Sequence, residues 1–310
     1  MKMYRPLIIA FLFVAVPVMG QERFLIDWDA VGEETLQHLS NLVRIESINP
    51  PGNETAVAEY VRDALAKEGI SSELYWTDPS RANLVARVNG NGSKRPILIM
   101  GHTDVVGVQA DRWEKAPFGG EREDGWLYGR GSLDDKDTVA AGMIVMMLLK
   151  RHGIELDRDI IFLAESGEEG TPEVGINYMV EHHWDKIAAE FALAEGGGGI
   201  EEDGHAHVVG VQTTEKMPRR VTLVARGTAG HGSVPRTDNA VAILARAVAR
   251  AAAWHTEARL NETTKTYFQR LAEISDAEDA FRYLNVDNPE ETEAIQQHFL
   301  ENFPYYYSIL

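Results

Sequence analysis

The chain has 310 residues, of which 44% are hydrophobic and 25% are charged, proportions ordinary for a soluble globular protein with room for more than one domain. A formal net charge of −18 and the lack of any basic run argue against nucleic acid as a partner. The absence of cysteine excludes disulfides, thiol nucleophiles and thiolate metal sites.

The first element in the chain is a predicted secretory signal peptide over residues 1–20. Lys2 and Arg5 form a short basic region, residues 7–19 are apolar, and small residues precede a cleavage site before Gln21. The apolar stretch is shorter than the ~20 residues that a membrane-spanning helix needs. We therefore expect export to the periplasm or the exterior, with no membrane attachment after cleavage.

Two amphipathic helices and then alternating strands and helices are predicted next. Apolar residues recur at helical spacing over residues 31–43 and again over 57–66. The alternation predicts an α/β fold with a mostly parallel sheet. Strands are expected at residues 84–88, 96–100, 159–164 and 191–194, with a turn at 89–94 and helices at 138–149 and 174–182.

The pattern changes near residues 214–218, where we expect a domain boundary. Strands are predicted at residues 207–212 and 220–224, and a long helix from Ala240 to about Trp254. The expected division is residues 21–215 in one domain and residues 216–310 in a second.

Metal-binding residue types follow three of the predicted strands. His102 and Asp104 follow the strand at 96–100, Glu168 and Glu169 follow the strand at 159–164, and Glu195 follows the strand at 191–194. Parallel strands end at one edge of a sheet, and ligands bind in the crevice there. Because carboxylates gathered at one edge repel one another unless a cation lies among them, these residues predict a metal hydrolase. Without cysteine, His and carboxylate ligands suit zinc in an open catalytic site.

Each motif alone also has a simpler interpretation. A His-x-Asp pair such as His102 and Asp104 is often only a surface hydrogen bond, although it is also typical of a metal-bound imidazole held by a carboxylate. Asp134 and Asp135 precede a predicted helix, where carboxylates serve as caps.

Adjacent glutamates, as at Glu168 and Glu169, are often a solvated pair. The functional alternative is a ligand beside a general base, which takes a proton from a zinc-bound water whose pKa has fallen from about 15.7 to about 7. His231, flanked by Gly230 and Gly232, is either a turn histidine or a donor to an oxyanion.

Taken together, six segments resemble the zinc metallopeptidase family that includes aminoacylase, acetylornithine deacetylase, succinyl-diaminopimelate desuccinylase and glutamate carboxypeptidase. Their order and spacing agree from about residue 30 to the C-terminus. They are Asn49-Pro50-Pro51-Gly52-Asn53, residues 101–106, residues 129–137, Glu168-Glu169-Gly170, Glu195-Gly196-Gly197 and residues 230–235.

The resemblance implies a centre with two zinc ions. Asp134 would bridge the metals, His102 and Glu195 would complete one site, and Glu169 would bind the other ion. The peptide bond between Asp134 and Asp135 would be cis.

It also implies roles for the remaining residues. Glu168 would be the general base and Asp104 would orient His102. Residues 21–215 would be the N-terminal part of a catalytic domain, and residues 216–310 part of an inserted α/β lid. His231 of the lid would reach the active site of a second subunit in a homodimer.

Two features depart from the family pattern. Asp137 stands where the motif usually has glycine. Relatives also continue further and supply a distal histidine to the second metal, so the second zinc site and the lid are expected to be incomplete in these 310 residues.

The expected reaction is attack of zinc-bound hydroxide on an amide or peptide bond next to a free carboxylate, as in a carboxypeptidase, dipeptidase or N-acyl-amino-acid hydrolase. A small peptide or an N-acyl amino acid would be the substrate. Two alternatives stay open: a catalytically inactive secreted fragment that keeps the motifs by descent, and a hydrolase that uses a single zinc.

Overall fold

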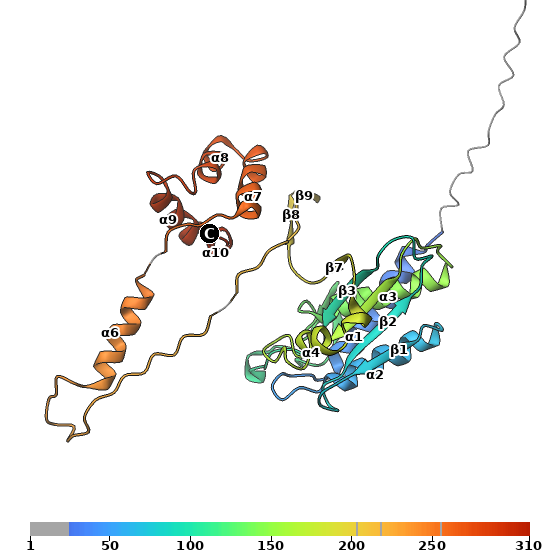
Figure 1. The fold of residues 1–310 in the computed structure, drawn as a ribbon, viewed down its shortest axis with the longest axis horizontal. Helices are drawn as coiled ribbons and strands as arrows, with labels where there is room; N and C mark the ends of the chain where they lie inside the picture. The colour runs from blue at the N-terminus through green and yellow to red at the C-terminus, as the bar shows by residue number, and fades with distance from the viewer. Residues whose placement is uncertain (1–24, 203, 218, 255) are drawn as a thin grey trace, which may run out of the picture. The chain divides into compact units, whose positions relative to one another are not determined.

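The computed structural model describes residues 25–202, 204–217, 219–254 and 256–310, so the predicted signal peptide lies outside the described residues. The chain divides into two compact units, the first ending at Glu195 and the second comprising Gly196–Leu310 (Figure 1). The sequence placed its boundary after residue 215, and the assignment of catalytic and lid domains stays a prediction. Within the described ranges, no helix is both long enough and apolar enough to cross a membrane.

A five-stranded sheet forms the centre of the first unit. In sheet order the strands are β1 (Ser72–Tyr75), β2 (Asn83–Val88), β6 (Ile160–Glu165), β3 (Ile97–His102) and β7 (Phe191–Leu193). β3 pairs in parallel with both β6 and β7, whereas β2 pairs antiparallel with β1 and β6, so β2 alone runs opposite to the other four strands. The predicted mostly parallel sheet is therefore confirmed.

The turn at residues 89–94 does not join two neighbouring strands, because β6 lies between β2 and β3. β7 is the edge strand next to β3, and all three of its residues are exposed.

Helices cover both faces of this sheet. Asp27 is the N-cap of the first helix, and its Oδ1 accepts a hydrogen bond from the Ala30 N–H at 3.1 Å. One face is covered by α1 (Trp28–Arg44), α2 (Glu54–Lys67) and α3 (Lys136–Arg151), and the other by α4 (Ile176–His182) and α5 (Trp184–Ile187).

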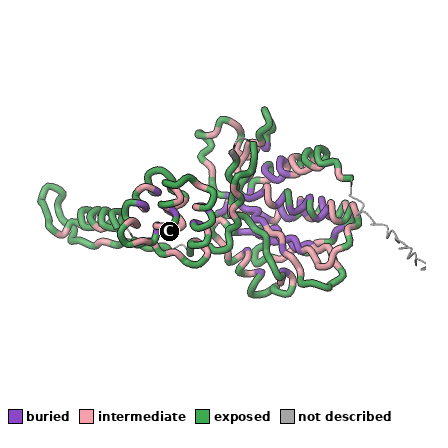
Figure 2. Tube along the Cα trace, turned by 90° about the horizontal axis from the view of Figure 1, so that it is seen from above, coloured by how far each residue is buried: buried purple, intermediate pink, exposed green. Residues whose placement is uncertain are grey.

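The inner strands β2 and β6 carry apolar residues on both sides, as expected for strands that helices cover on both faces. Leu84 and Phe162 pack against α1–α3, whereas Val85 and Leu163 pack against Met179 of α4. Figure 2 shows the buried residues concentrated in these central strands and on the helix sides that face them. The C-terminal ends of β3 and β6 therefore project from a close-packed base, whereas β7 is exposed.

Residues 103–135 form a long connection between β3 and α3. It contains the short helix η1 (Ala110–Arg112) and a hairpin of β4 (Glu121–Glu123) and β5 (Trp126–Tyr128).

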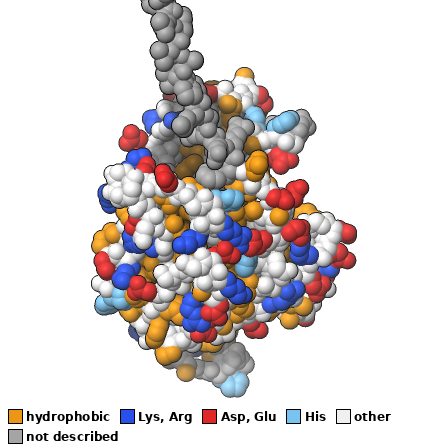
Figure 3. Space-filling view, turned by 90° about the vertical axis from the view of Figure 1, so that its right-hand side faces the viewer, with side chains coloured by type: hydrophobic (Ala, Val, Ile, Leu, Met, Phe, Trp, Pro, Cys, Tyr) orange, Lys and Arg blue, Asp and Glu red, His pale blue; other side chains and the backbone are white. Residues whose placement is uncertain are grey.

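On the face of the molecule that Figure 3 shows, acidic and basic side chains are interspersed rather than segregated.

The second unit begins with a two-stranded antiparallel pair, β8 (Gly198–Glu202) and β9 (His205–Gly210), and continues with helices. The predicted helix from Ala240 is confirmed. An aromatic cluster that includes Phe268, Tyr283 and Phe299 forms the core of this unit. Its helices are α6 (Ala240–Ala252), α7 (Glu262–Glu273), α8 (Ala277–Leu284), α9 (Thr292–Asn302) and α10 (Pro304–Ser308).

The strand predicted at residues 220–224 is wrong. These residues have no regular secondary structure, and Val221 and Val224 are exposed. A strand needs a neighbouring strand to satisfy its backbone N–H and C=O groups, and this segment pairs with none of the strands in the described residues. Its apolar residues alone were an insufficient signal.

Candidate metal centre

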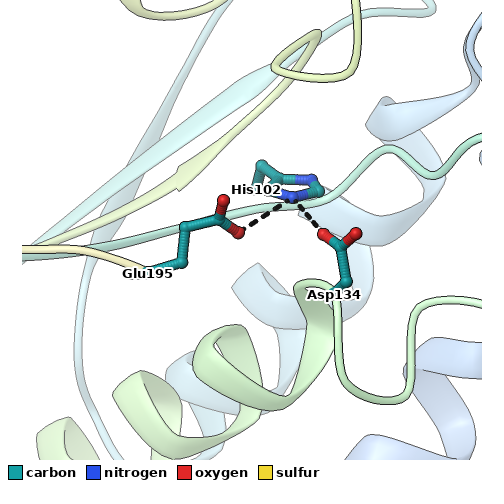
Figure 4. Close-up of side chains that lie close together, drawn as sticks. All are labelled: His102, Asp134 and Glu195. Atoms are coloured by element: carbon teal, nitrogen blue, oxygen red, sulfur yellow. Dashed lines mark hydrogen bonds and ion pairs between the residues drawn. The ribbon is translucent and has the colours of Figure 1, made fainter. Parts of the chain in front are cut away.

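Three segments of the first unit bring their polar residues to one edge of the sheet. β6, β3 and β7 are consecutive, parallel neighbours, so their C-terminal ends lie together. His102 is the last residue of β3, and Glu195 follows the end of β7 by two positions. Asp134 reaches the same place from the turn just before α3 (Figure 4). The predicted meeting of strand ends is thus observed for these residues.

His102, Asp134 and Glu195 form one close group. The Nε2 atom of His102 lies 2.9 Å from Asp134 Oδ1 and 3.2 Å from Glu195 Oε2. In Figure 4 both carboxylates point at this ring nitrogen. The imidazole is buried, whereas the Asp134 and Glu195 side chains are 60% and 47% exposed, so the group opens toward solvent on the carboxylate side.

The dimensions of this group fit a zinc ion. Zinc binds His nitrogen and carboxylate oxygen at about 2.0–2.2 Å with tetrahedral geometry, which places neighbouring ligand atoms about 3.3 Å apart. The observed separations of 2.9 and 3.2 Å need only small adjustments. Three protein ligands with a fourth position open is also the arrangement of catalytic rather than structural zinc.

The surroundings of His102 suit a metal ligand. Its Nδ1 lies 3.0 Å from the backbone oxygen of Asp104 and 3.4 Å from Asp104 Oδ1, so Nδ1 carries a proton and directs Nε2 toward the carboxylates. Burial by itself lowers the pKa of His102, but the hydrogen bond to Asp104 and the negative charges of Asp104, Asp135 and Glu195 raise it to about 10. The site therefore strongly attracts positive charge.

Asp104 connects the residues of the centre through hydrogen bonds. It is fully buried, and its carboxylate accepts hydrogen bonds from the backbone N–H groups of Glu168 and Glu169 at 3.1 and 3.0 Å and from Asn49 Nδ2 at 2.7 Å. Burial opposes ionisation, but hydrogen bonds from His102 and Asn49 lower the pKa of Asp104. An ionised Asp104 thus connects the imidazole to the loop that carries both glutamates.

Glu168 and Glu169 lie at the rim of the group. Glu168 Oε2 is 3.9 Å from His102 Nε2, and its side chain is 49% exposed, a position open to a water molecule. Within the described residues, Glu169 does not join the three donor groups that lie within 4.8 Å of one another. Burial, followed by repulsion from Asp134, raises the pKa of Glu169. The roles predicted for both residues stay predictions.

Asp135 fastens the end of β3 to the start of α3. It is buried, and its Oδ2 accepts a hydrogen bond from the backbone N–H of His102 at 3.0 Å. The bond between Asp134 and Asp135 is cis, as the family resemblance implies.

His231 lies in the second unit, exposed, with its Nδ1 2.8 Å from Ser233 Oγ. Its predicted contact with an oxyanion stays a prediction. The structure therefore brings together His102, Asp134 and Glu195, with Asp104 and Glu168 beside them.

Several polar residues behind the site were not predicted as site residues. Asn49 contacts Asp104 directly, and Thr171, which is half-buried, and Arg81 continue the hydrogen-bonded chain. Asn49 belongs to the Asn-Pro-Pro-Gly-Asn segment and so had a sequence signal. Arg81 and its partner Glu54 had none, because nothing in their spacing marks a contact across 27 residues.

Comparison with known proteins identifies the family of the chain. Residues 98–303 match the model of peptidase family M20/M25/M40. The chain belongs to this family. The resemblance inferred from the six segments is thereby confirmed.

Curated relatives carry several related activities in their names. A probable succinyl-diaminopimelate desuccinylase of Staphylococcus epidermidis is 32% identical over 215 residues, which cover 68% of this chain and 49% of the relative. The N-fatty-acyl-amino acid synthase/hydrolase of Xenopus tropicalis is 33% identical over 229 residues, covering 70% and 45%. The chain spans about half the length of the curated relatives it matches.

Among solved structures, the M20 family metallo-carboxypeptidase of Sulfolobus solfataricus is similar at 26% identity. The match covers 55% of this chain and 39% of that chain, with a TM-score of 0.48.

Proposed function

We propose that this protein is a zinc-dependent hydrolase of an amide or peptide bond next to a free carboxylate. The observation that carries the proposal is the convergence of His102, Asp134 and Glu195 at the C-terminal edge of a parallel sheet, within 4.8 Å of one another. Membership of a peptidase family, and relatives named for desuccinylation and for N-acyl amino acid hydrolysis, support a small peptide or an N-acyl amino acid as the substrate.

The metal ligands, the general base and the residue that orients His102 have separate roles in the proposed reaction. His102 Nε2, Asp134 and Glu195 would hold a zinc ion, which when bound would supply Lewis-acid activation of water and of the scissile carbonyl. Glu168, half exposed and 3.9 Å from His102 Nε2, takes the proton of the attacking water and delivers it to the leaving amine. Asp104 keeps His102 in the tautomer that leaves Nε2 free for the ion.

Further features of the protein are part of this proposal. Glu169 and Asp134 would hold a second zinc ion. Residues 21–215 are catalytic and residues 216–310 belong to a lid, through which two chains pair so that His231 stabilises the oxyanion. Removal of residues 1–20 accompanies export from the cytoplasm.

Zinc binding is the first test. The purified chain is expected to bind zinc, and His102→Ala is expected to abolish binding at this centre because it removes the only nitrogen ligand of the group. Zinc content and a chelator competition titration measure this. Equal affinity in the wild type and in His102→Ala would refute the proposed centre.

Hydrolysis is the second test, with a panel of dipeptides and N-acyl amino acids in the presence of zinc. Glu168→Gln is expected to keep its zinc and lose about 100-fold or more of the turnover, because it removes the proton acceptor. Glu173→Gln changes an exposed glutamate of the same loop and serves as the control. Full turnover in Glu168→Gln would refute its role, and zinc binding without any turnover would favour the inactive-fragment alternative.

A further inference from the structure

A chain of hydrogen-bonded side chains leads from the candidate metal centre into the core of the first unit. Its first member, Asn49, is 4% exposed. The amide Nδ2 of Asn49 lies 2.7 Å from Asp104 Oδ2 and 2.9 Å from Thr171 Oγ1. Because an amide nitrogen carries two hydrogens, Asn49 donates to both groups at once.

The far end of this chain is a buried ion pair. Arg81 grips the Glu54 carboxylate with two parallel bonds, from Nε at 2.6 Å and Nη2 at 2.7 Å, and Glu54 has no exposed surface. The same Nη2 donates to Thr171 Oγ1 at 2.8 Å. A two-bond Arg–carboxylate pair has a fixed geometry, so the Thr171 hydroxyl accepts a bond from a donor that does not move.

Backbone packing fixes the guanidinium as well. Gly52 has a φ of +92°, and a Cβ at this position would lie 2.1 Å from Arg81 Nε. Arg81 also donates from Nη1 to the Pro51 carbonyl at 3.0 Å. The Asn-Pro-Pro-Gly segment is thus shaped around this arginine.

Thr171 therefore closes a ring of contacts around the loop that carries the two glutamates. At its start, the N–H groups of Glu168 and Glu169 bind the Asp104 carboxylate. Further along the loop, the Thr171 hydroxyl binds Asn49, which binds the same carboxylate. A shift of this loop would break bonds to a buried negative charge, which are stronger than bonds between neutral groups.

We propose that Thr171 is a positioning residue for the metal centre: its hydroxyl links the Arg81–Glu54 pair to Asn49 and Asp104, and so fixes the orientation of His102. The inference rests on the proposed function, because it concerns the affinity of the same zinc centre. Thr171→Val keeps the shape of the side chain but removes the acceptor of two donors, Asn49 Nδ2 and Arg81 Nη2. Loss of a group that bonds directly to a metal ligand commonly weakens metal binding about 10- to 100-fold, and because Thr171 reaches His102 only through Asn49 and Asp104, we expect the lower end of this range.

The test is the zinc dissociation constant of the chain, measured by competition with a chelator. Thr171→Val is expected to bind zinc about 10-fold more weakly. Thr171→Ser restores the hydroxyl and is expected to return to within about threefold of the wild type. Thr35→Val makes the same chemical change in α1, where the hydroxyl donates to the Val31 carbonyl of its own helix, and is expected to bind zinc as the wild type does.

A double-variant cycle separates positioning from general damage to the fold. If Thr171 acts through Asp104, then Thr171→Val has a much smaller effect in an Asp104→Asn background than in the wild type. Amide hydrogen exchange of β3 and β6 shows whether each variant is folded. Wild-type affinity in Thr171→Val, or an equal loss in both backgrounds, would overturn the inference. Failure of the proposed function looks different, because zinc affinity would then not depend on His102.

Discussion

Replacement of Arg81 by methionine probes how much the buried ion pair contributes to the stability of the first unit. Methionine fills a similar length but has no N–H groups. Glu54, with no exposed surface, loses both of its guanidinium bonds, and the Pro51 carbonyl and the Thr171 hydroxyl lose one donor each.

The expected cost follows from that burial. Removing one partner of a buried ion pair lowers the free energy of unfolding by about 3–5 kcal/mol, because an unpaired charge stays behind. Burial already raises the pKa of Glu54, and Arg81 opposes that rise. Without Arg81 the pKa rises further, so the folded variant binds a proton that the unfolded chain releases. The free energy of unfolding of the variant therefore falls as pH rises from the Glu54 pKa of the unfolded chain to the higher pKa of the folded variant. Its loss of stability relative to the wild type is larger at pH 8 than at pH 5.

Native-state hydrogen exchange of the β2 and β6 amides measures this cost in the first unit alone. Arg87→Met is the matched control, because Arg87 pairs with Asp159 at 2.8 Å where both side chains are partly exposed, and its loss is expected to cost only about 0–1 kcal/mol. The double variant Arg81→Met/Glu54→Gln is expected to recover part of the loss. The reasoning would be refuted if Arg81→Met cost no more than Arg87→Met, or if its cost were the same at both pH values.

Two further predictions concern the same unit. Burial raises the pKa of Glu165 from its usual 4.5 to about 7, so the unfolded chain releases this proton first and stability falls as pH rises from 4.5 to 7. Between pH 4.5 and pH 8, the free energy of unfolding of Glu165→Gln is expected to rise by about 3 kcal/mol relative to that of the wild type. Urea unfolding of the zinc-free chain measures this difference. Equal pH dependence of the unfolding free energy in the two proteins would contradict it. Gly52→Ala is expected to destabilise clearly more than Gly92→Ala, because both have a positive φ but only Gly52 lies against Arg81. Equal exchange rates of the β2 amides in the two variants would contradict the close approach.

The sequence predicted the position of the site because it depends on a general property of parallel sheets. His102 and Glu195 stand directly after apolar runs, and the ends of neighbouring parallel strands meet at one edge. Asp134 was different, since a pair of aspartates before a helix also serves as a cap, and only the family resemblance gave it a ligand role.

The supporting network could not be predicted from the sequence. Asn49 and Thr171 are 122 positions apart, and Arg81 and Thr171 are 90 positions apart. Hydrophobic periodicity reports which side of an element is buried, but carries no information about polar contacts between distant segments. The same limit explains the strand order, because nothing in the spacing of residues 84–88 and 96–100 shows that β6 inserts between them.

The position of β7 gives the metal centre a mechanical consequence. This strand is only three residues long, pairs with β3 alone, and leaves Phe191 and Leu193 58% exposed. A zinc ion bound by both Glu195 and His102 would link β7 to β3. Above the dissociation constant, each tenfold rise in free zinc would stabilise the folded, zinc-bound state by about 1.4 kcal/mol. Removal of zinc by a chelator would then destabilise this edge strand first, so that proteolysis and aggregation would begin at β7.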